Sequence, residues 1–188
     1  MKATPETQTF RSTLHAAVTQ PGEAPWGFVI LPKEISQTLP RRGRTTVQGT
    51  LNGHAFQAML EPDGQLSHWL KVNPDLMGQS SCTFGDAVTL SITPVAQEPD
   101  PDIPPDFRAA LNATPEALEV WQATTTLARV DWIHWITSAK QPRTRSKRIA
   151  DACDMLASGK RRVCCFDPSG YYSRAFSAPE ASRFANEQ

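Results

Sequence analysis

The four histidines are the first residues to test for catalytic or metal chemistry. They are His15, His54, His68 and His134. Their spacing matches none of the short patterns that place two histidines on one zinc ion, so we expect no metal and no cofactor. His54 follows a predicted turn and His68 precedes a predicted strand, and we expect both to be exposed. His134 stands three residues after Asp131 on a predicted helix, which favours a surface contact over an oriented general base.

The cysteines offer one further reactive group, the neighbouring pair Cys164 and Cys165. Such a pair can bind a soft metal or sense an oxidant, and the preceding Arg161 and Arg162 would stabilise a thiolate. Burial of one of the two thiols in a strand is favoured instead, because cysteine often behaves as a small apolar residue. The absence of any C-x-x-C motif favours reduced thiols in a cytoplasmic protein.

A basic stretch at residues 139–162 holds eight Lys or Arg against two Asp. In a helix capped by Thr144, both Lys147 and Arg148 can pair with Asp151. Arg145 lies in the first turn, where the helix dipole disfavours a cation, so a partner elsewhere is indicated. That partner is either a carboxylate of the acidic segment 97–106 or an anion held at the helix N-terminus. The candidate binding residues are Thr144, Arg145, Lys147, Arg148, Arg161 and Arg162.

Composition limits the classes of function. The 188 residues carry 19 basic and 19 acidic side chains, so no overall field attracts nucleic acid or a membrane surface. Residues 1–139 hold nine basic and 14 acidic side chains (net −5), and residues 140–188 hold ten basic and five acidic ones (net +5). No apolar run reaches the roughly 20 residues that span a bilayer. The polar N-terminus lacks the core of a signal peptide, which favours a cytoplasmic location.

Turn signals divide the first half into about six short strands. Asn52-Gly53 predicts a tight hairpin between strands at 45–51 and 54–60. Alternating apolar residues in "AVTLSIT" indicate a strand with one buried face. We therefore expect a small antiparallel β-barrel over residues 1–96. Its aromatic residues are expected to fill the interior rather than stack on nucleic-acid bases: Trp26, Phe28, Phe56 and Trp69.

The second half has a helical period. Residues 97–106, "QEPDPDIPPD", contain four prolines and four acidic residues and predict an extended linker. A helical module follows at 107–162. Thr114 and Thr144 are expected to be the N-caps of two of its helices, and Gly159 is expected to end the last one. Residues 163–188 predict a hairpin around "DPSG" and then a polar tail. The fold class is thus α+β, a barrel followed by a helical module.

Several stretches, in this order, resemble a known family. They are "WGFVILP", "VQGTLNGHAFQAMLEPDGQLSHWLKV", "GDAVTLSI", the proline-rich segment and "WITSAKQPRTRSKRIADACDMLASGKR". The chain is similar over residues 8–162 to the YdeI/OmpD-associated, or bacteriocin-protection, family with an N-terminal small β-barrel domain of unknown function. The resemblance implies a bacterial source and a link to envelope stress or peptide resistance, but no reaction. It also implies a periplasmic location as the alternative to the cytoplasm.

Together these features favour a non-enzymatic interaction or stress-protection protein. The alternative is a binder of nucleic acid or another anionic ligand that uses the clusters at 143–148 and 160–162. An enzyme of unfamiliar type ranks third, because no nucleophile, base and orienting group stand at a familiar spacing. An anionic ligand and a protein partner both stay open, and the sequence does not set the oligomeric state.

Overall fold

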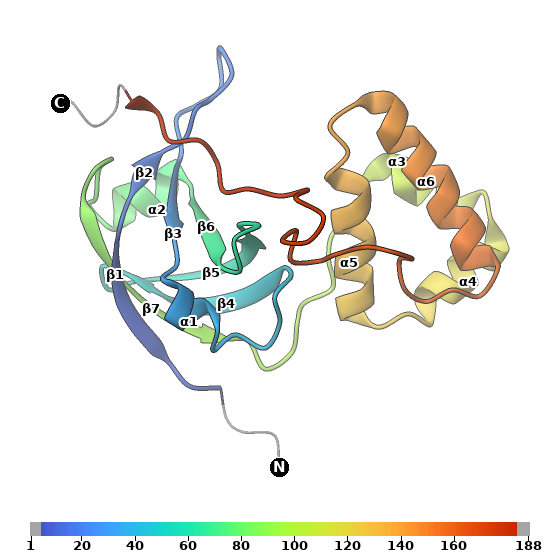
Figure 1. The fold of residues 1–188 in the computed structure, drawn as a ribbon, viewed down its shortest axis with the longest axis horizontal. Coiled ribbons are helices and arrows are strands. Elements are labelled where there is room, and N and C mark those ends of the chain that lie inside the picture. The colour runs from blue at the N-terminus through green and yellow to red at the C-terminus, as the bar shows by residue number, and fades with distance from the viewer. Residues whose placement is uncertain (1–4, 184–188) are drawn as a thin grey trace. The chain divides into compact units, whose positions relative to one another are not determined.

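The chain forms two compact units in a computed structural model that describes residues 5–183. The barrel unit comprises Met1–Gln97 together with Asp167–Gln188, and the helical unit comprises Glu98–Phe166. Strands lie in the first unit, and four of the six helices lie in the second, among the described residues (Figure 1). The predicted α+β class, a barrel followed by a helical module, is confirmed.

Seven antiparallel strands form a nearly closed barrel in the order β1-β7-β4-β5-β6-β3-β2. Their bounds are β1 Gln8–Thr13, β2 His15–Ala16, β3 Gly27–Ile30, β4 Thr45–Leu51, β5 His54–Pro62, β6 His68–Val72 and β7 Ala87–Pro94. Only Leu14 separates β1 from β2. One bent segment therefore supplies both ends of the strand order, pairing with β7 before the bend and with β3 after it. Two short helices, α1 Lys33–Ser36 and α2 Pro74–Gln79, were not predicted.

The β4–β5 hairpin has the predicted register. Thr45 pairs with Leu60 at the open end, and Leu51 pairs with His54 beside the turn. The turn residues Asn52 and Gly53 have φ angles of 48° and 85°, as a two-residue turn between twisted strands requires.

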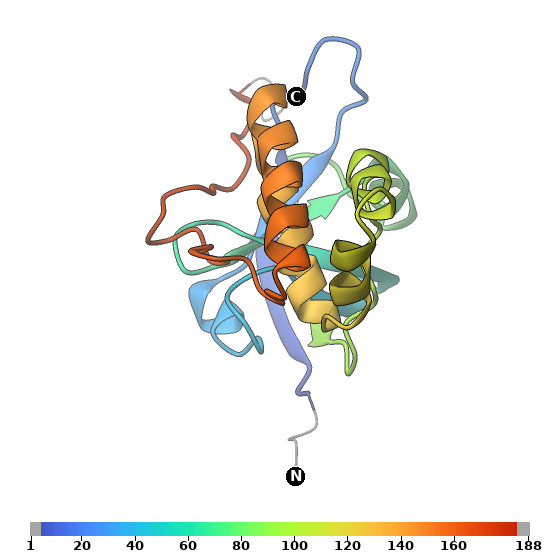
Figure 2. The same cartoon turned by 90° about the vertical axis from the view of Figure 1, so that its right-hand side faces the viewer.

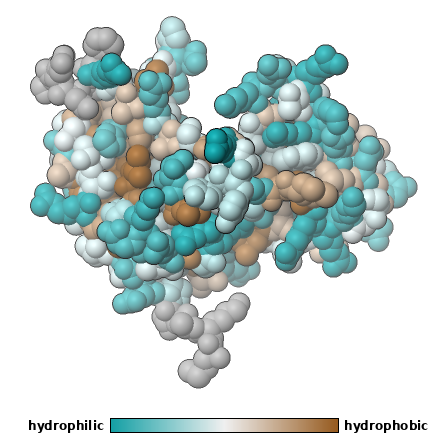
Figure 3. Space-filling model, in the orientation of Figure 1, coloured by the Kyte–Doolittle hydropathy of each residue, from teal (hydrophilic) through white to brown (hydrophobic). Residues whose placement is uncertain are grey.

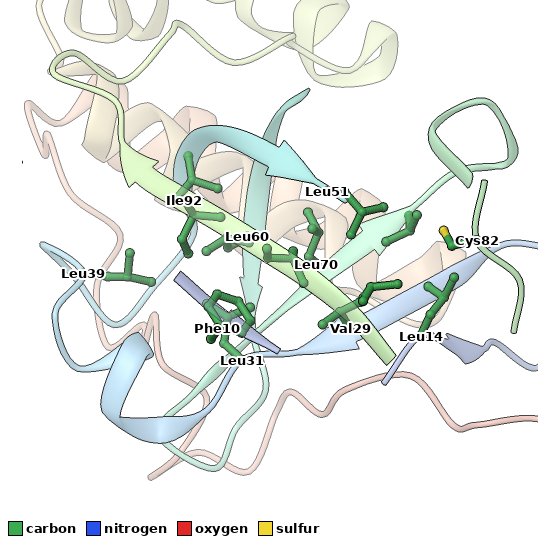
Figure 4. Close-up of a cluster of buried hydrophobic side chains, with 14 residues drawn as sticks. Phe10, Leu14, Val29, Leu31, Leu39, Leu51, Leu60, Leu70, Cys82 and Ile92 are labelled. Carbon is green, nitrogen blue, oxygen red and sulfur yellow. The ribbon is translucent and has the colours of Figure 1, made fainter. Parts of the chain in front are cut away.

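The barrel core follows from the period of two along the strands. Val88, Leu90 and Ile92 of β7 are each at most 1% exposed and point inward together. Figure 4 shows the side chains of this core converging from several strands and connecting loops. Its buried members include Phe10, Leu14, Val29, Leu31, Leu39, Leu51, Leu60, Leu70, Cys82 and Ile92.

The C-terminal segment returns to the barrel unit. Ala181 forms an isolated antiparallel bridge with Ala17, next to β2. The predicted hairpin around "DPSG" is wrong for the residues described, which form turns there instead of paired strands. The Asp167 carboxylate explains the turns, because it accepts hydrogen bonds from the backbone N–H groups of Ser169, Tyr172 and Ser173 at 2.9–3.1 Å. These bonds satisfy the backbone locally and compete with strand pairing.

The helical unit contains α3 Pro105–Asn112, α4 Pro115–Gln122, α5 Thr126–Thr137 and α6 Pro142–Ala157. The longest helix, α6, packs beside α3 and α4 (Figure 2) and also contacts α5. The core contains Phe107, Leu111, Trp121, Trp132, Ile136, Ile149 and Leu156. Thr114 precedes α4 as predicted, but its side chain makes no capping hydrogen bond to that helix.

The acidic segment between the barrel strands and α3 is held by the helical unit. Asp100 Oδ1 lies 3.0 Å from Arg129 Nη1 and accepts a hydrogen bond from Thr126 Oγ1 at 2.9 Å. Helix α3 begins at Pro105, so the last two residues of the segment predicted as a linker are helical. Proline suits that first position because it has no N–H to satisfy there.

Candidate anion-binding surface

The first residue of α6 is Pro142, not a residue after Thr144. Gln141 occupies the N-cap position without a side-chain capping bond, and Pro142 takes the first helical position. The predicted cap at Thr144 is therefore wrong, and this residue lies exposed in the first turn. Proline fixes φ near the helical value, and the helix starts three residues earlier than it would with Thr144 as its N-cap.

Arg145 reaches the acidic segment. Its Nε and Nη2 atoms donate to the two carboxylate oxygens of Asp106 at 2.7 and 2.9 Å. This fork-on-carboxylate geometry is the strongest form of an Arg–Asp pair. The hydrogen bond from Arg145 lowers the pKa of Asp106, and the same bond raises the pKa of Arg145. Of the two partners considered for this cation, the structure provides the carboxylate.

The next two cations are also engaged within the unit. Lys147 Nζ lies 2.6 Å from Asp151 Oδ2, the predicted pair one turn along the helix. Arg148 does not join it: its Nη1 donates instead to the Trp135 carbonyl at 2.5 Å and to Ser138 Oγ at 3.1 Å. Its guanidinium also lies over the Trp135 ring, 5.4 Å from the centroid. Arg148 therefore ties α6 to α5.

The end of α6 presents a different set of cations. Gly159 has φ +89°, and the N–H of Lys160 bonds to the Met155 carbonyl, which closes the helix with a left-handed glycine. Lys160, Arg161 and Arg162 follow, and all three are exposed. The Arg161 carbonyl accepts a hydrogen bond from Trp132 Nε1 at 3.3 Å, so the buried ring fixes this backbone.

We call Lys160, Arg161 and Arg162 the terminal cluster. Among residues 5–183, no ion pair to these three side chains is formed. On the face shown in Figure 3, hydrophilic residues follow much of the outline of the helical unit. Of the six candidate binding residues, the structure thus gives internal partners to Arg145, Lys147 and Arg148 and leaves the side chains of Arg161 and Arg162 in solvent.

Comparison with protein families matches both units. Residues 100–159 match the model described as "Bacteriocin-protection, YdeI or OmpD-Associated". Residues 100–159 therefore form a YdeI/OmpD-associated domain. Residues 10–92 match a second model, "Domain of unknown function (DUF1905)", as the resemblance implied. No curated protein matches the chain.

The family's own domain, at 100–159, holds the whole of α6 but ends just before the terminal cluster. Arg145, its partner Asp106, and the Arg148–Trp135 contact all lie inside the matched residues. The contacts that give the helical unit its shape therefore belong to the family domain, whereas Lys160, Arg161 and Arg162 lie just beyond it.

Within the DUF1905 domain, sequence reasoning missed a buried histidine. His68 is fully buried, so its predicted exposure is wrong, whereas His54 is exposed as expected. The Gly43 carbonyl can only accept, so His68 Nε2 donates to it at 2.9 Å and Nδ1 accepts from Ser36 Oγ at 2.7 Å. Burial lowers the pKa of His68, and the bond to Gly43 and the charge of Asp63 offset this only in part.

The Ser36–His68 pair has the connectivity of a nucleophile and its base. Both side chains are fully buried, however, so the pair fastens α1 to β6. A period-two signal existed for His68: Leu70 and Val72 point inward on β6, and His68 has the same parity. His134 is buried as well, and its ring packs edge-on against Phe166 at 5.5 Å.

The DUF1905 domain also carries an aromatic cluster outside its main core. Trp26 and Trp69 stack with centroids 6.4 Å apart, and Phe28 meets Trp69 edge-on at 6.3 Å. Lys71 Nζ lies 4.4 Å from the centroid of the Trp26 ring. Trp26 and Trp69 remain half-exposed, so their predicted place in the interior is wrong. Alternation along β6 accounts for this, because Leu70 and Val72 occupy the inward positions.

Two kinds of feature are absent from residues 5–183. No group of three or more His, Cys, Asp or Glu side chains is arranged to hold a metal ion. No helix in the same part of the chain is long and apolar enough to cross a membrane.

Proposed function

We propose that this YdeI/OmpD-associated chain is a non-enzymatic interaction protein in bacterial stress protection, and that its terminal cluster contacts an acidic protein partner. The observation that carries the proposal is the contrast along α6. Arg145, Lys147 and Arg148 have partners inside the unit and Arg143 stands alone and exposed in the first turn, whereas three consecutive cations at the end of the helix have exposed side chains. Exposed, uncommitted cations attract anionic surfaces and speed association with them.

The backbone beneath these cations is fixed. The turn at Gly159 and the hydrogen bond from Trp132 to Arg161 hold the segment in one conformation. A partner that meets a fixed backbone pays less conformational entropy than one that orders a loose tail. The helix C-terminus is also partly neutralised, because the carbonyls of Asp154, Met155 and Leu156 accept hydrogen bonds from the residues that follow. An approaching anion therefore meets the cations more than the negative end of the helix dipole.

Nucleic acid is the second candidate, since phosphates bind the same cations. Three phosphate contacts would give a logarithmic salt slope of about −3, which is roughly 40-fold weaker binding at about 200 mM than at 50 mM salt. The net charge of the whole chain is zero, so it adds no long-range attraction for a polyanion to that of the terminal cluster. This supports a protein partner over nucleic acid.

The test compares a labelled acidic peptide with a labelled DNA duplex by fluorescence anisotropy at these two salt concentrations. The variant carries Arg161→Glu and Arg162→Glu. The matched control carries Arg11→Glu and Lys33→Glu, which change the net charge equally at exposed positions of the barrel unit. We expect the peptide to bind more tightly than DNA at the higher salt, and only the first variant to lose binding. Equal loss in both variants would show a charge effect with no site, and tighter DNA binding would favour the second candidate.

We also propose a cytoplasmic location, in which the cysteines stay reduced. All four cysteines are free, and Cys82 and Cys153 lie buried in the cores of different units. Two exposed neighbouring thiols, Cys164 and Cys165, suit a reducing compartment. Alkylation of the protein in intact cells, before lysis, should label both; a pair already oxidised in growing cells would point to the periplasm.

A further inference from the structure

The pair Cys164 and Cys165 does not adopt the strand geometry predicted for it. Both side chains are exposed, and the two Sγ atoms lie 3.3 Å apart. Adjacent residues in an extended strand point to opposite faces. Cys165 departs from that geometry with φ +58°, in the left-handed region that non-glycine residues rarely occupy. This conformation brings the two sulfur atoms together, although it is unfavourable for a residue with a Cβ.

Ionisation of the pair is asymmetric. A hydrogen bond to Cys164 is the largest cause of a raised pKa at Cys165, and Lys160 opposes the shift. The raised pKa keeps the proton on Cys165, which holds its sulfur beside that of Cys164 at 3.3 Å. Lys160, Arg161 and Arg162 precede the pair with only Val163 between, and nearby cations favour a thiolate.

No other thiol competes for an oxidant at this place. Cys82 is 5% exposed in the barrel core, and Cys153 is 6% exposed in the core of the helical unit. Burial raises the pKa of both thiols, which keeps them protonated and unreactive.

We propose that Cys164 and Cys165 form a reversible oxidation site, in which a peroxide closes a disulfide between the two neighbouring residues. The thiolate of one cysteine attacks one peroxide oxygen, so an S–O bond forms, the O–O bond breaks, and the hydroxide released takes a proton to become water. The sulfur of the neighbouring cysteine then attacks the sulfenic sulfur, forming the S–S bond and expelling a second water. Two thiols lose two electrons and two protons, and one hydrogen peroxide becomes two water molecules.

Geometry makes this disulfide a labile one. The α-carbons of adjacent residues are about 3.8 Å apart, whereas the two halves of a relaxed disulfide place them at about 4.4–6.8 Å. A bridge between neighbours is therefore strained, and strained exposed disulfides are the readily reduced, regulatory kind. The site stands two residues before Asp167, where the chain passes from the helical unit to the barrel unit. Oxidation thus alters the covalent geometry of one of the two connections between the units.

The test treats the full-length protein with hydrogen peroxide, alkylates it and digests it with trypsin. Cleavage after Arg162 and Arg174 yields a peptide of residues 163–174 that holds this pair and neither of the other cysteines. We expect that peptide to lose two hydrogen atoms and to regain them with a dithiol reductant. Thiol titration of the folded protein should fall from two accessible thiols to none, and in denaturant from four to two.

Two variants provide the controls. In Cys165→Ser, Cys164 has no neighbour to resolve the sulfenic acid, so it should advance to the sulfinic acid, which the parent avoids. In Arg161→Gln with Arg162→Gln, oxidation should slow while its product stays the same. The proposal is overturned if the parent peptide accumulates oxygen atoms without losing two hydrogens. It also fails if oxidised protein runs as a disulfide-linked dimer.

Discussion

Breaking the ion pair between Arg145 and Asp106 should cost the helical unit about 1 kcal/mol of unfolding free energy. Two short hydrogen bonds of 2.7 and 2.9 Å join the side chains in a bidentate pair, which places the coupling at the strong end of the range for surface pairs. Solvent limits it, because the two side chains remain 31% and 47% exposed. A fully buried pair would cost about 3 kcal/mol or more when one partner is removed, and this pair is too exposed to solvent to reach that value.

The same pair should make stability depend on pH in a defined direction. The hydrogen bond from Arg145 lowers the pKa of Asp106 in the folded chain. The coupling is therefore fully present above the pKa of an unfolded aspartate, about 3.9, and is lost as the pH falls through the lower folded value. At neutral pH the two single variants Arg145→Ala and Asp106→Ala should be similarly destabilised, and in strong acid the difference from the parent should shrink.

The assay is a double-mutant cycle from denaturant melts followed by circular dichroism at 222 nm, which reports mainly on the helices. The matched control is the cycle for Lys147 and Asp151, a single contact of 2.6 Å whose side chains are 74% and 39% exposed. That cycle should give about 0.3–0.5 kcal/mol. A coupling for Arg145 and Asp106 no larger than the control, or one unchanged in acid, would refute the reasoning.

Three further predictions concern the barrel unit. Ser36→Ala leaves His68 Nδ1 without its partner and should cost about 1–3 kcal/mol of unfolding free energy. Burial also lowers the pKa of His68. The stability of the parent, measured by melts across pH, should therefore decline below about pH 6.5, where only the unfolded histidine takes up a proton. Gly49→Ala should cost roughly 3 kcal/mol or more of unfolding free energy, since the added Cβ would lie 1.8 Å from a backbone oxygen of β7. The control Gly53→Ala, at φ +85° with open space around it, should cost about 1 kcal/mol in the same melts. Equal losses in the two variants would contradict the packing argument. Deleting residues 177–188 removes two backbone hydrogen bonds beside β2 and should lower the melting temperature of the barrel by the equivalent of about 2 kcal/mol; an unchanged melt would show that the segment contributes nothing.

Local patterns predicted the elements well where one physical cause acted alone. The turn at Asn52 and Gly53 needs two positive φ angles, and that need set the β4–β5 register. The apolar period of two in β7 and the proline at the first position of α4 predicted their elements in the same way. At α6 two start signals competed, a threonine cap and a proline two residues earlier, and the proline determined the start.

The candidate site was harder to predict because its partners are distant in sequence. Arg145 and Asp106 are 39 residues apart, and the sequence left an acidic partner and an anion as alternatives. His68 depends on Ser36 and Gly43, which no short pattern connects to it. The left-handed conformation of Cys165 has no signal in the sequence, since glycine and asparagine are the residues that usually mark it.

The return of the chain to the barrel has a consequence for synthesis on the ribosome. Glu98–Phe166 must be translated before the segment that pairs beside β2 emerges. At about 5–20 residues per second, those 69 residues take roughly 3–14 seconds. During that interval the edge beside β2 is uncovered in the nascent barrel, a risk for association with other nascent chains. A strand of only two residues, His15–Ala16, keeps that temporary edge too short to recruit a foreign strand.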